Sequence, residues 1–167
     1  MITLLRVDNR LLHGQILETW APRLRARRVV VADDEAAASP LAQAAMTLCL
    51  PPELPAEIRE VAGVDWRALA ASPEAVLVLV REVAVLRRAV EGGLTPALAP
   101  RINLGNVHYA PGRAPLTPSV YLSDEEVRTV RELVGRGFEV EARAVPSDAP
   151  VGAGTLVDKY AAVKGGG

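Results

Sequence analysis

The residues with the clearest capacity for chemistry lie in one short stretch near the N-terminus, RVDNRLLHGQILETW (residues 6–20). It contains His13, one of the two histidines of the chain, with Arg6 and Arg10 before it and Gly14 after it. A neutral imidazole can attack phosphorus through its unprotonated nitrogen. Guanidinium groups and backbone N–H donors neutralise the charge of the incoming phosphoryl group. These residue types at this spacing suit a histidine that takes up and passes on a phosphoryl group.

The other residues of this stretch fit the same chemistry. Asp8 can orient an arginine or hold the second imidazole nitrogen, which would fix the tautomer of the ring. Gly14 allows the backbone to approach a phosphate, and a helix beginning near Gly14 or Gln15 offers free N–H groups and a positive dipole end. Residue types and spacing leave a second interpretation open, in which His13 caps or packs and the arginines form surface ion pairs.

Strands and helices that alternate along the chain must position this stretch. The run Ala75–Val80 is continuously apolar, which is typical of a strand covered on both faces. The alternation predicts an α/β fold, a single domain with a mostly parallel open sheet and helices on both faces. The predicted strands are Ile2–Val7, Val29–Ala32, Ala75–Val80, Ile102–Leu104, Ser119–Leu122 and Phe138–Ala144.

Two helix starts are marked by capping residues. Ser39 and Pro40 form an N-cap followed by a proline at the first helical position. Ser123 begins the sequence SDEE, a capping box, and glycines at 135 and 137 suit the end of the helix that follows.

Polar residues follow several of the predicted strands. In parallel sheets, ligand sites gather at the carboxyl ends of the strands, so we expect these side chains to lie near one another. The acidic run after the second strand can instead be a solvated loop that favours a helix N-terminus. The asparagines can contact phosphate or hold a turn, and the second histidine can line the site or bond to backbone. The residues in question are Asp33, Asp34, Asn103, Asn106 and His108.

Composition narrows the classes of function. The chain has 167 residues, of which 50% are hydrophobic and 23% charged, which predicts one globular domain. The net charge of −1 argues against nucleic acid as a partner. We expect no metal site, because two histidines and one cysteine supply few ligands.

The sequence also predicts where the protein works. The N-terminal MITLLRVD is typical of a strand rather than of a signal peptide, and no apolar run approaches the roughly 20 residues of a membrane helix. We therefore expect a cytoplasmic protein.

The remaining unusual residues fit packing roles. Cys49 and Met46 share an apolar helical pattern and are expected in the core. Trp20 and Trp66 are expected to pack rather than to bind a ligand.

Asp33-Asp34 resembles the acidic pair of two-component receiver domains, but such a pair follows the first strand of a receiver, whereas this one follows the second. A receiver also needs an aspartate at the end of a later strand, where this chain has Arg81. The receiver interpretation is therefore disfavoured. Hydrolase, P-loop, zincin and CxxC motifs are missing from the sequence.

The histidine stretch closely resembles the active-site segment of the IIB subunits of the mannose/fructose/sorbose family of the bacterial phosphotransferase system. Members of that family read R-[IV]-D-[DNE]-R-L-[IL]-H-G-Q-V, with a tryptophan a few residues later. VVVADDEAA resembles the V-V-x-N-D-x-x-A segment of the family, and INLGNVHY resembles its N-[VI]-G-[NG]-x-H segment. The matching residues of the first segment are Arg6, Asp8, Arg10, Leu11, His13, Gly14, Gln15 and Trp20.

The resemblance implies a mostly parallel α/β sheet and a specific reaction. His13 would accept a phosphoryl group from a histidine of a IIA subunit and pass it to a sugar bound by the membrane subunits IIC and IID. This is the reaction of a protein-N(π)-phosphohistidine–sugar phosphotransferase. Arg6 and Arg10 would neutralise the phosphate, and Asp8, Gly14 and Gln15 would shape the loop.

The resemblance also carries expectations about organisation. No metal or organic cofactor is expected, and IIA is expected to be a separate protein. The IIB domain is expected to span residues 1–160, with residues 161–167 as a flexible tail. The subunit would be cytoplasmic and peripherally associated with the inner membrane through IIC and IID.

Two rival interpretations remain open. The first is a regulatory phosphocarrier that does not drive uptake, and its His13 chemistry would be identical. The second is a IIB-like binding module without acceptor activity, and Asp33 is the one feature that favours it. Asp33 replaces an asparagine of the family pattern, and an extra carboxylate that points into the site would oppose a phosphate.

Overall fold

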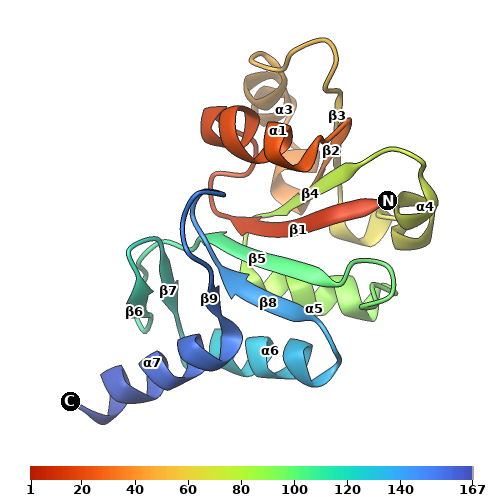
Figure 1. Cartoon of the computed structure of the whole chain (residues 1–167). Helices are drawn as coiled ribbons and strands as arrows, with labels where there is room; N and C mark the ends of the chain where they lie inside the picture. The colour runs from red at the N-terminus through yellow and green to blue at the C-terminus, as the bar shows by residue number, and fades with distance from the viewer. Residues whose placement is uncertain (167) are drawn as a thin grey trace.

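The computed structural model describes residues 1–166 and contains a seven-stranded sheet in the order β3-β2-β4-β1-β5-β8-β9 (Figure 1). Neighbouring strands of this sheet are parallel except β9, which is antiparallel to β8. Strands β6 and β7 form a separate antiparallel pair. The strands are β1 (Ile2–Asp8), β2 (Arg28–Ala32), β3 (Ala56–Arg59), β4 (Val76–Val80), β5 (Arg101–Asn106), β6 (Ala114–Thr117), β7 (Val120–Leu122), β8 (Glu139–Ala142) and β9 (Val151–Gly152).

Helices cover both faces of this sheet. Side chains of α4, α5, α6 and α7 pack on one face, and side chains of η1, α1 and α2 pack on the other. The helices are η1 (Ile16–Trp20, a π-helix), α1 (Ala21–Leu24), α2 (Asp34–Ala37), α3 (Pro40–Thr47), η2 (Val61–Gly63, a 3₁₀-helix), α4 (Trp66–Ala71), α5 (Val83–Glu91), α6 (Asp124–Gly135) and α7 (Ala153–Gly165).

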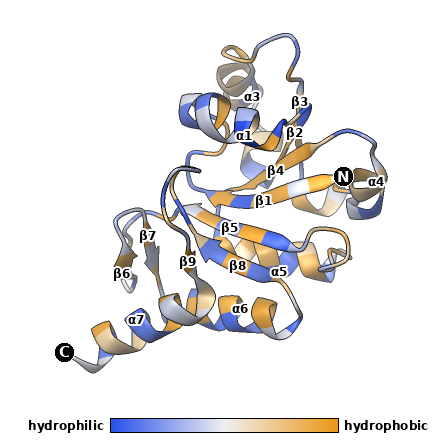
Figure 2. Cartoon of the chain, viewed as in Figure 1, coloured by the Kyte–Doolittle hydropathy of each residue, from blue (hydrophilic) through white to orange (hydrophobic). Residues whose placement is uncertain are grey.

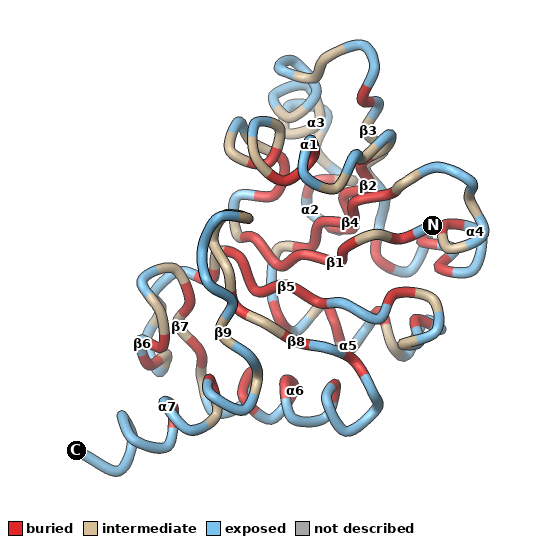
Figure 3. Tube along the Cα trace, viewed as in Figure 1, coloured by how far each residue is buried: buried red, intermediate tan, exposed pale blue. Residues whose placement is uncertain are grey.

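Strand β4 lies at the centre of the core and is buried along its whole length (Figure 3). Its side chains alternate between the two faces: Val76, Val78 and Val80 pack in one apolar cluster, and Leu77 and Leu79 pack in the other. A strand with helices on both faces needs apolar residues at every position, which explains the uninterrupted AVLVLV run. The hydropathy colouring shows the same apolar centre (Figure 2).

The predicted α/β class, the mostly parallel sheet and the six predicted strands are confirmed, with ends shifted by one or two residues. The predicted strand at residues 119–122 forms β7, which pairs with β6 outside the main sheet. Three strands were not predicted, because β3 is interrupted by charged residues, β6 contains Pro115 and β9 has two residues.

Both predicted helix starts are confirmed. The Ser39 hydroxyl accepts from the N–H of Ala42, and Ser123 and Glu126 form both bonds of a capping box. Gly137 has a φ of 99°, a conformation that favours glycine, just after α6 ends.

The prediction that Cys49 is a core residue is wrong: its side chain is exposed. It follows α3, a helix at the edge of the molecule in which no residue is fully buried, and Met46 of that helix is only partly buried. An apolar helical pattern identifies a face but not the element that covers it. Trp66 packs in the core as expected.

The C-terminal helix α7 continues to Gly165, beyond residue 160, where we expected the domain to end. Gly167, the last residue of the expected tail, lies outside the described residues. Within residues 1–166, no helix is both long and apolar enough to cross a membrane.

Candidate functional site

The loop from Asn9 to His13 connects the C-terminal end of β1 to the following helix. Leu11 has a φ of 55°, a left-handed conformation that is strained for leucine, while its side chain is buried in the core. The N–H groups of Ile16 and Leu17 donate to the carbonyl oxygen of His13. His13 therefore sits at the N-terminus of the helix, as the sequence indicates.

A hydrogen bond fixes the imidazole of His13. Its Nε2 lies 3.2 Å from Asp8 Oδ2. The His13 side chain is 17% exposed, while that of Asp8 is fully buried. Burial alone would raise the pKa of Asp8, but the hydrogen bond to His13 and the charge of Arg6 outweigh it and lower that pKa. An ionised Asp8 only accepts hydrogen bonds, so Nε2 carries a proton and Nδ1 is left with the lone pair of the neutral ring.

The structure corrects the role expected of Arg6. Its guanidinium is fully buried and donates to Asp8 Oδ2 at 3.0 Å and to Asn103 Oδ1 at 2.5 Å. It also donates at 3.0 Å to the carbonyl oxygens of Arg143 and Ala144. Because its N–H groups all bond inside the protein, Arg6 holds Asp8 from the buried side of the site and does not reach a phosphoryl group at the surface.

Trp20 covers this buried arginine. The guanidinium carbon of Arg6 lies 5.0 Å from the centre of the indole ring. The indole N–H donates to the carbonyl oxygen of Ala144, which Arg6 also contacts. Trp20 therefore packs as predicted, and it excludes water from the ion pair beneath the loop.

Arg10 is the arginine at the surface of the site. Its side chain is 45% exposed and donates to Gln15 Oε1 at 3.0 Å. With the amide oxygen of Asn106 turned toward it, Asn106 accepts from the same guanidinium at 2.8 and 3.1 Å. The backbone N–H of Arg10 donates to Asp8 Oδ1. Gln15 and Asn106 thus hold a solvent-facing cation in the loop that carries His13.

Gly14 and Asn103 have different surroundings. Within residues 1–166, no heavy atom lies within 4 Å of the position that a Cβ of Gly14 would occupy, which leaves the backbone there open. Asn103 is fully buried, and its amide accepts from Arg6 and donates to the carbonyl of Arg143. The roles considered for Asn103 were contact with phosphate and the holding of a turn. The structure places it inside β5 rather than in a turn, with its buried amide bonded to Arg6.

Asp33 and Asp34 point to other partners than His13. Asp33 Oδ1 accepts from the N–H of Ala36 and caps α2, and both Asp33 oxygens bind the guanidinium of Arg81 at 2.8 and 2.9 Å. Asp34 accepts from the N–H of Val61 and pairs with Arg88. Asp33 therefore lies at a helix N-terminus, as the solvated-loop alternative expected, but it is buried rather than solvated. Asp34 is directed toward η2 and α5.

His108 has an exposed side chain, and its backbone N–H donates to Asn9 Oδ1. Sequence reasoning missed Asn9, which lies inside the motif but belongs to a residue type common in loops. It also missed Gly105: a Cβ there would lie 1.9 Å from the guanidinium carbon of Arg6. The glycine of the INLGN segment was the available signal.

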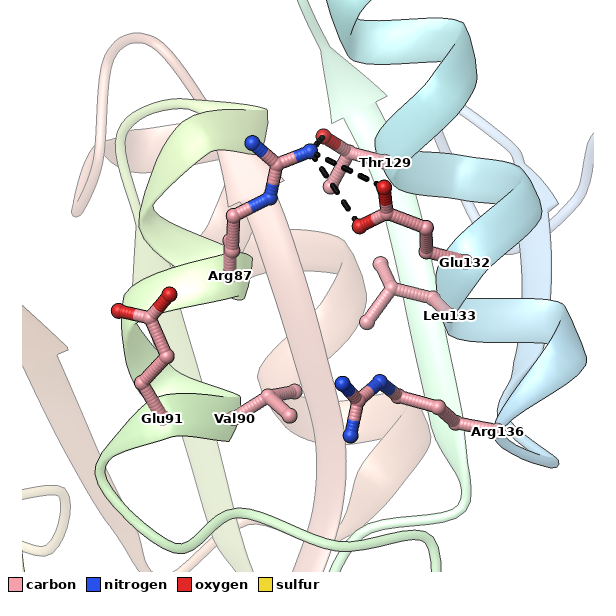
Figure 4. A pocket seen from close by; sticks show the side chains of 7 residues that line it. All are labelled: Arg87, Val90, Glu91, Thr129, Glu132, Leu133 and Arg136. Carbon is pink, nitrogen blue, oxygen red and sulfur yellow. Dashed lines mark hydrogen bonds and ion pairs between the residues drawn. The ribbon is translucent and has the colours of Figure 1, made fainter.

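The structure also describes a cavity of about 270 Å³ between α5 and α6 (Figure 4). Across the cavity, Arg87 contacts Thr129 and Glu132. In the described part of the chain, no three His, Cys, Asp or Glu side chains are grouped so as to hold a metal ion. The His13 loop is therefore the best candidate for chemistry.

Comparisons with known proteins point the same way. The model of the family "PTS system sorbose subfamily IIB component" matches residues 2–165. The N-acetylgalactosamine-specific phosphotransferase enzyme IIB component 2 of Escherichia coli is 30% identical over 151 residues, which are 90% of this chain and 94% of that protein. The crystal structure of manxB from Thermoanaerobacter tengcongensis is 28% identical and superposes with a TM-score of 0.83, covering 96% of both chains.

A longer relative also matches. The mannose-specific EIIAB component of Escherichia coli K12 is 27% identical over 161 residues, which are 95% of this chain but 49% of that protein. The chain thus spans about half the length of that relative. With the fold, the histidine loop and the family model in agreement, the chain belongs to the sorbose-subfamily IIB components of the phosphotransferase system.

Proposed function

We propose that this chain is a phosphocarrier whose His13 accepts a phosphoryl group on Nδ1 and then passes it to a sugar. The observation that carries the proposal is the hydrogen bond between His13 Nε2 and Asp8 Oδ2. It holds the proton on Nε2 and leaves the lone pair of Nδ1 as the nucleophile. The 17% exposure of the ring allows a large protein donor to reach it.

The chemistry needs no further catalyst in this chain. Nδ1 attacks phosphorus while the bond from phosphorus to the donor histidine nitrogen breaks, and the proton on Nε2 remains in place. The ring becomes cationic, and ionised Asp8 stabilises that charge. Arg10 and the positive end of the helix dipole, which lies beside His13, neutralise the phosphoryl oxygens. In the second transfer, a sugar hydroxyl oxygen attacks phosphorus and the P–N bond breaks, which returns the neutral ring with its proton on Nε2. The proton of the sugar hydroxyl is released to water.

The donor and acceptor follow from the family. The donor is the phosphohistidine of a IIA protein, and the acceptor is a hexose-type sugar held by the membrane subunits IIC and IID. Relatives are named for mannose, N-acetylgalactosamine and sorbose, which supports a sugar of this class. The chain would work in the cytoplasm, at the inner face of the membrane that holds those subunits.

The contacts of Asp33 support a competent carrier over a non-catalytic binding module. The interpretation as a non-catalytic binding module rested on Asp33, an additional carboxylate expected near the site. Both oxygens of that carboxylate bind Arg81, so its charge is compensated within the protein. The extra acidic residue therefore gives little reason to expect loss of acceptor activity.

The test is the intact mass of the protein after incubation with phosphoenolpyruvate, the general phosphotransferase proteins and a IIA protein. We expect the gain of one acid-labile phosphoryl group, which is lost in His13→Ala. His108→Ala is the matched control, because it removes the other histidine, whose side chain is exposed, and it should be phosphorylated normally. A phosphorylated His13→Ala protein, or an unmodified wild type with active IIA, would contradict the proposal.

A further inference from the structure

Asn9 joins the ends of three neighbouring strands of the sheet. Its backbone N–H donates to the carbonyl of Asn106 at 2.9 Å, and its side-chain Nδ2 donates to the carbonyl of Arg81 at 2.9 Å. Its Oδ1 accepts from the N–H of His108. Asn9 lies in the loop that carries His13, so these bonds tie that loop to residues just after β4 and at the end of β5 (Figure 1).

Arg81, whose carbonyl accepts from Asn9, is itself held by an ion pair. Arg81 follows β4 directly, and its Nε and one terminal nitrogen bind the two oxygens of Asp33 at 2.9 and 2.8 Å. The Asp33 side chain is only 7% exposed and also caps α2 through the N–H of Ala36. Such a bidentate pair has one well-defined geometry, so the side chain and the carbonyl of Arg81 are both anchored.

The pair also controls charge at this edge of the sheet. Burial would raise the pKa of Asp33, but the hydrogen bonds from Arg81 and Ala36 outweigh it, lower that pKa and keep the carboxylate ionised. Acidic groups also face this pair: Asp34 lies near Asp33, and Glu35 and Glu82 lie near Arg81. A cation, Arg88, lies beside Asp34 and is paired with Asp34 itself. Without Arg81, a buried negative charge would stand uncompensated at the strand ends where a phosphoryl group with nearly two negative charges must arrive.

We propose that Asp33, Arg81 and Asn9 form a clamp that holds the His13 loop in its transfer geometry. In this clamp, Arg81 is a positioning residue that links the buried carboxylate to the loop. The inference rests on the proposed function for the rate measurements, but the clamp itself is a structural claim that can be tested without phosphorylation. The clamp also explains how this chain accommodates an aspartate at position 33, because the charge of Asp33 holds Arg81 in place.

Neighbouring residues provide a matched control. Asp34 and Arg88 form another ion pair from the same two parts of the chain, with 2.7 Å between Arg88 and Asp34 Oδ2. Both of its side chains are about half exposed, and neither contacts the His13 loop through the bonds that the structure describes. Arg88→Gln therefore removes an arginine–aspartate pair and leaves the clamp intact.

The experiment compares Arg81→Gln, Asp33→Asn, the double variant, Asn9→Ala and Arg88→Gln. For each folded protein, kcat and KM are measured for transfer from phosphorylated IIA. The ring ¹⁵N signals of His13 are recorded in the unphosphorylated protein. We expect Arg81→Gln and Asn9→Ala to lower kcat by up to about a hundredfold, the cost of misplacing a reacting group by 1 Å. KM should stay unchanged, and the His13 ring signals should shift or broaden.

The double variant is the decisive measurement. The two amide side chains that it introduces can share a neutral hydrogen bond without a buried charge, so it should recover most of the kcat lost in Arg81→Gln. Arg88→Gln should match the wild type. The proposal is overturned if Arg81→Gln keeps the wild-type kcat and ring signals, if the double variant fails to recover, or if only KM changes. An unphosphorylated wild type would instead refute the proposed function, and the ring signals would still test the clamp.

Discussion

Replacing Gly105 with alanine tests the importance of the buried ion pair under the loop. A Cβ at this position would lie 1.9 Å from the guanidinium carbon of Arg6 and 2.1 and 2.2 Å from its terminal nitrogens. Real Cβ atoms essentially never come closer than 3.0 Å to such atoms. Either β5 or the guanidinium must therefore move by more than about 1 Å in a closely packed interior.

The expected cost follows from what holds Arg6 in place. The guanidinium is fully buried and bonded to Asp8, Asn103 and two backbone carbonyls, so it cannot move without leaving some of them unpaired. Overpacking a core costs about 1–3 kcal/mol, and breaking a buried ion pair costs about 3–5 kcal/mol. These terms overlap, so we expect Gly105→Ala to lower the free energy of unfolding by about 3–5 kcal/mol. For a chain of this size, that lowers Tm by roughly 6–20 °C.

The assay is urea unfolding followed by circular dichroism, with the phosphotransfer rate measured on the folded protein. Gly135→Ala is the control. Gly135 is the last residue of α6, and within the described residues nothing lies within 4 Å of the position that a Cβ would occupy there. Alanine is also a better helix former than glycine. It should match or slightly exceed the wild type in stability. If Gly105→Ala unfolds within about 0.5 kcal/mol of the wild type, the range of a neutral surface change, the inferred constraint on Arg6 is wrong.

Four further outcomes are expected. Arg10→Ala should slow phosphotransfer to His13, since it removes a charge-assisted contact worth about 1.5–3 kcal/mol; an unchanged rate would mean that this exposed cation has no part in transfer. Ser123→Ala should lower the free energy of unfolding by about 1 kcal/mol through loss of the α6 cap, and a variant as stable as the wild type would contradict that value. Folding lowers the pKa of Asp33, so its ionised carboxylate stabilises the folded protein at any pH above the pKa of an aspartate in the unfolded chain, about 3.9. This stabilisation is lost as the pH falls through the pKa of Asp33 in the folded protein. In acid, the free energy of unfolding of Asp33→Asn should therefore fall less steeply with pH than that of the wild type. Cys49, which is exposed, should react with a thiol reagent in the native protein as fast as in urea, and slow labelling would show that it is covered.

The fold could be predicted from the sequence because burial patterns are local. The run AVLVLV identifies β4 as a doubly covered strand, and the capping residues Ser39 and Ser123 mark two helix starts within the segments that they cap. Short strands such as β9 could not be predicted, because two residues carry no periodic pattern. The exposure of Cys49 also could not be predicted, since it depends on which elements cover α3.

At the candidate site, the motif by itself determined that His13 follows a strand and precedes a helix, and that Asp8 can hold its ring. The motif could not distinguish Arg6 from Arg10, because two arginines four residues apart in a short segment look equivalent in sequence. Only the tertiary structure decided that Arg6 points into the protein, where Asn103 and the Arg143–Ala144 backbone surround it, while Arg10 faces solvent. It likewise decided that Asp33 is neutralised by Arg81, 48 positions away in the sequence. The physical reason is that the charge balance and burial of a side chain depend on the strands beside it, and in a parallel sheet those strands come from distant parts of the chain.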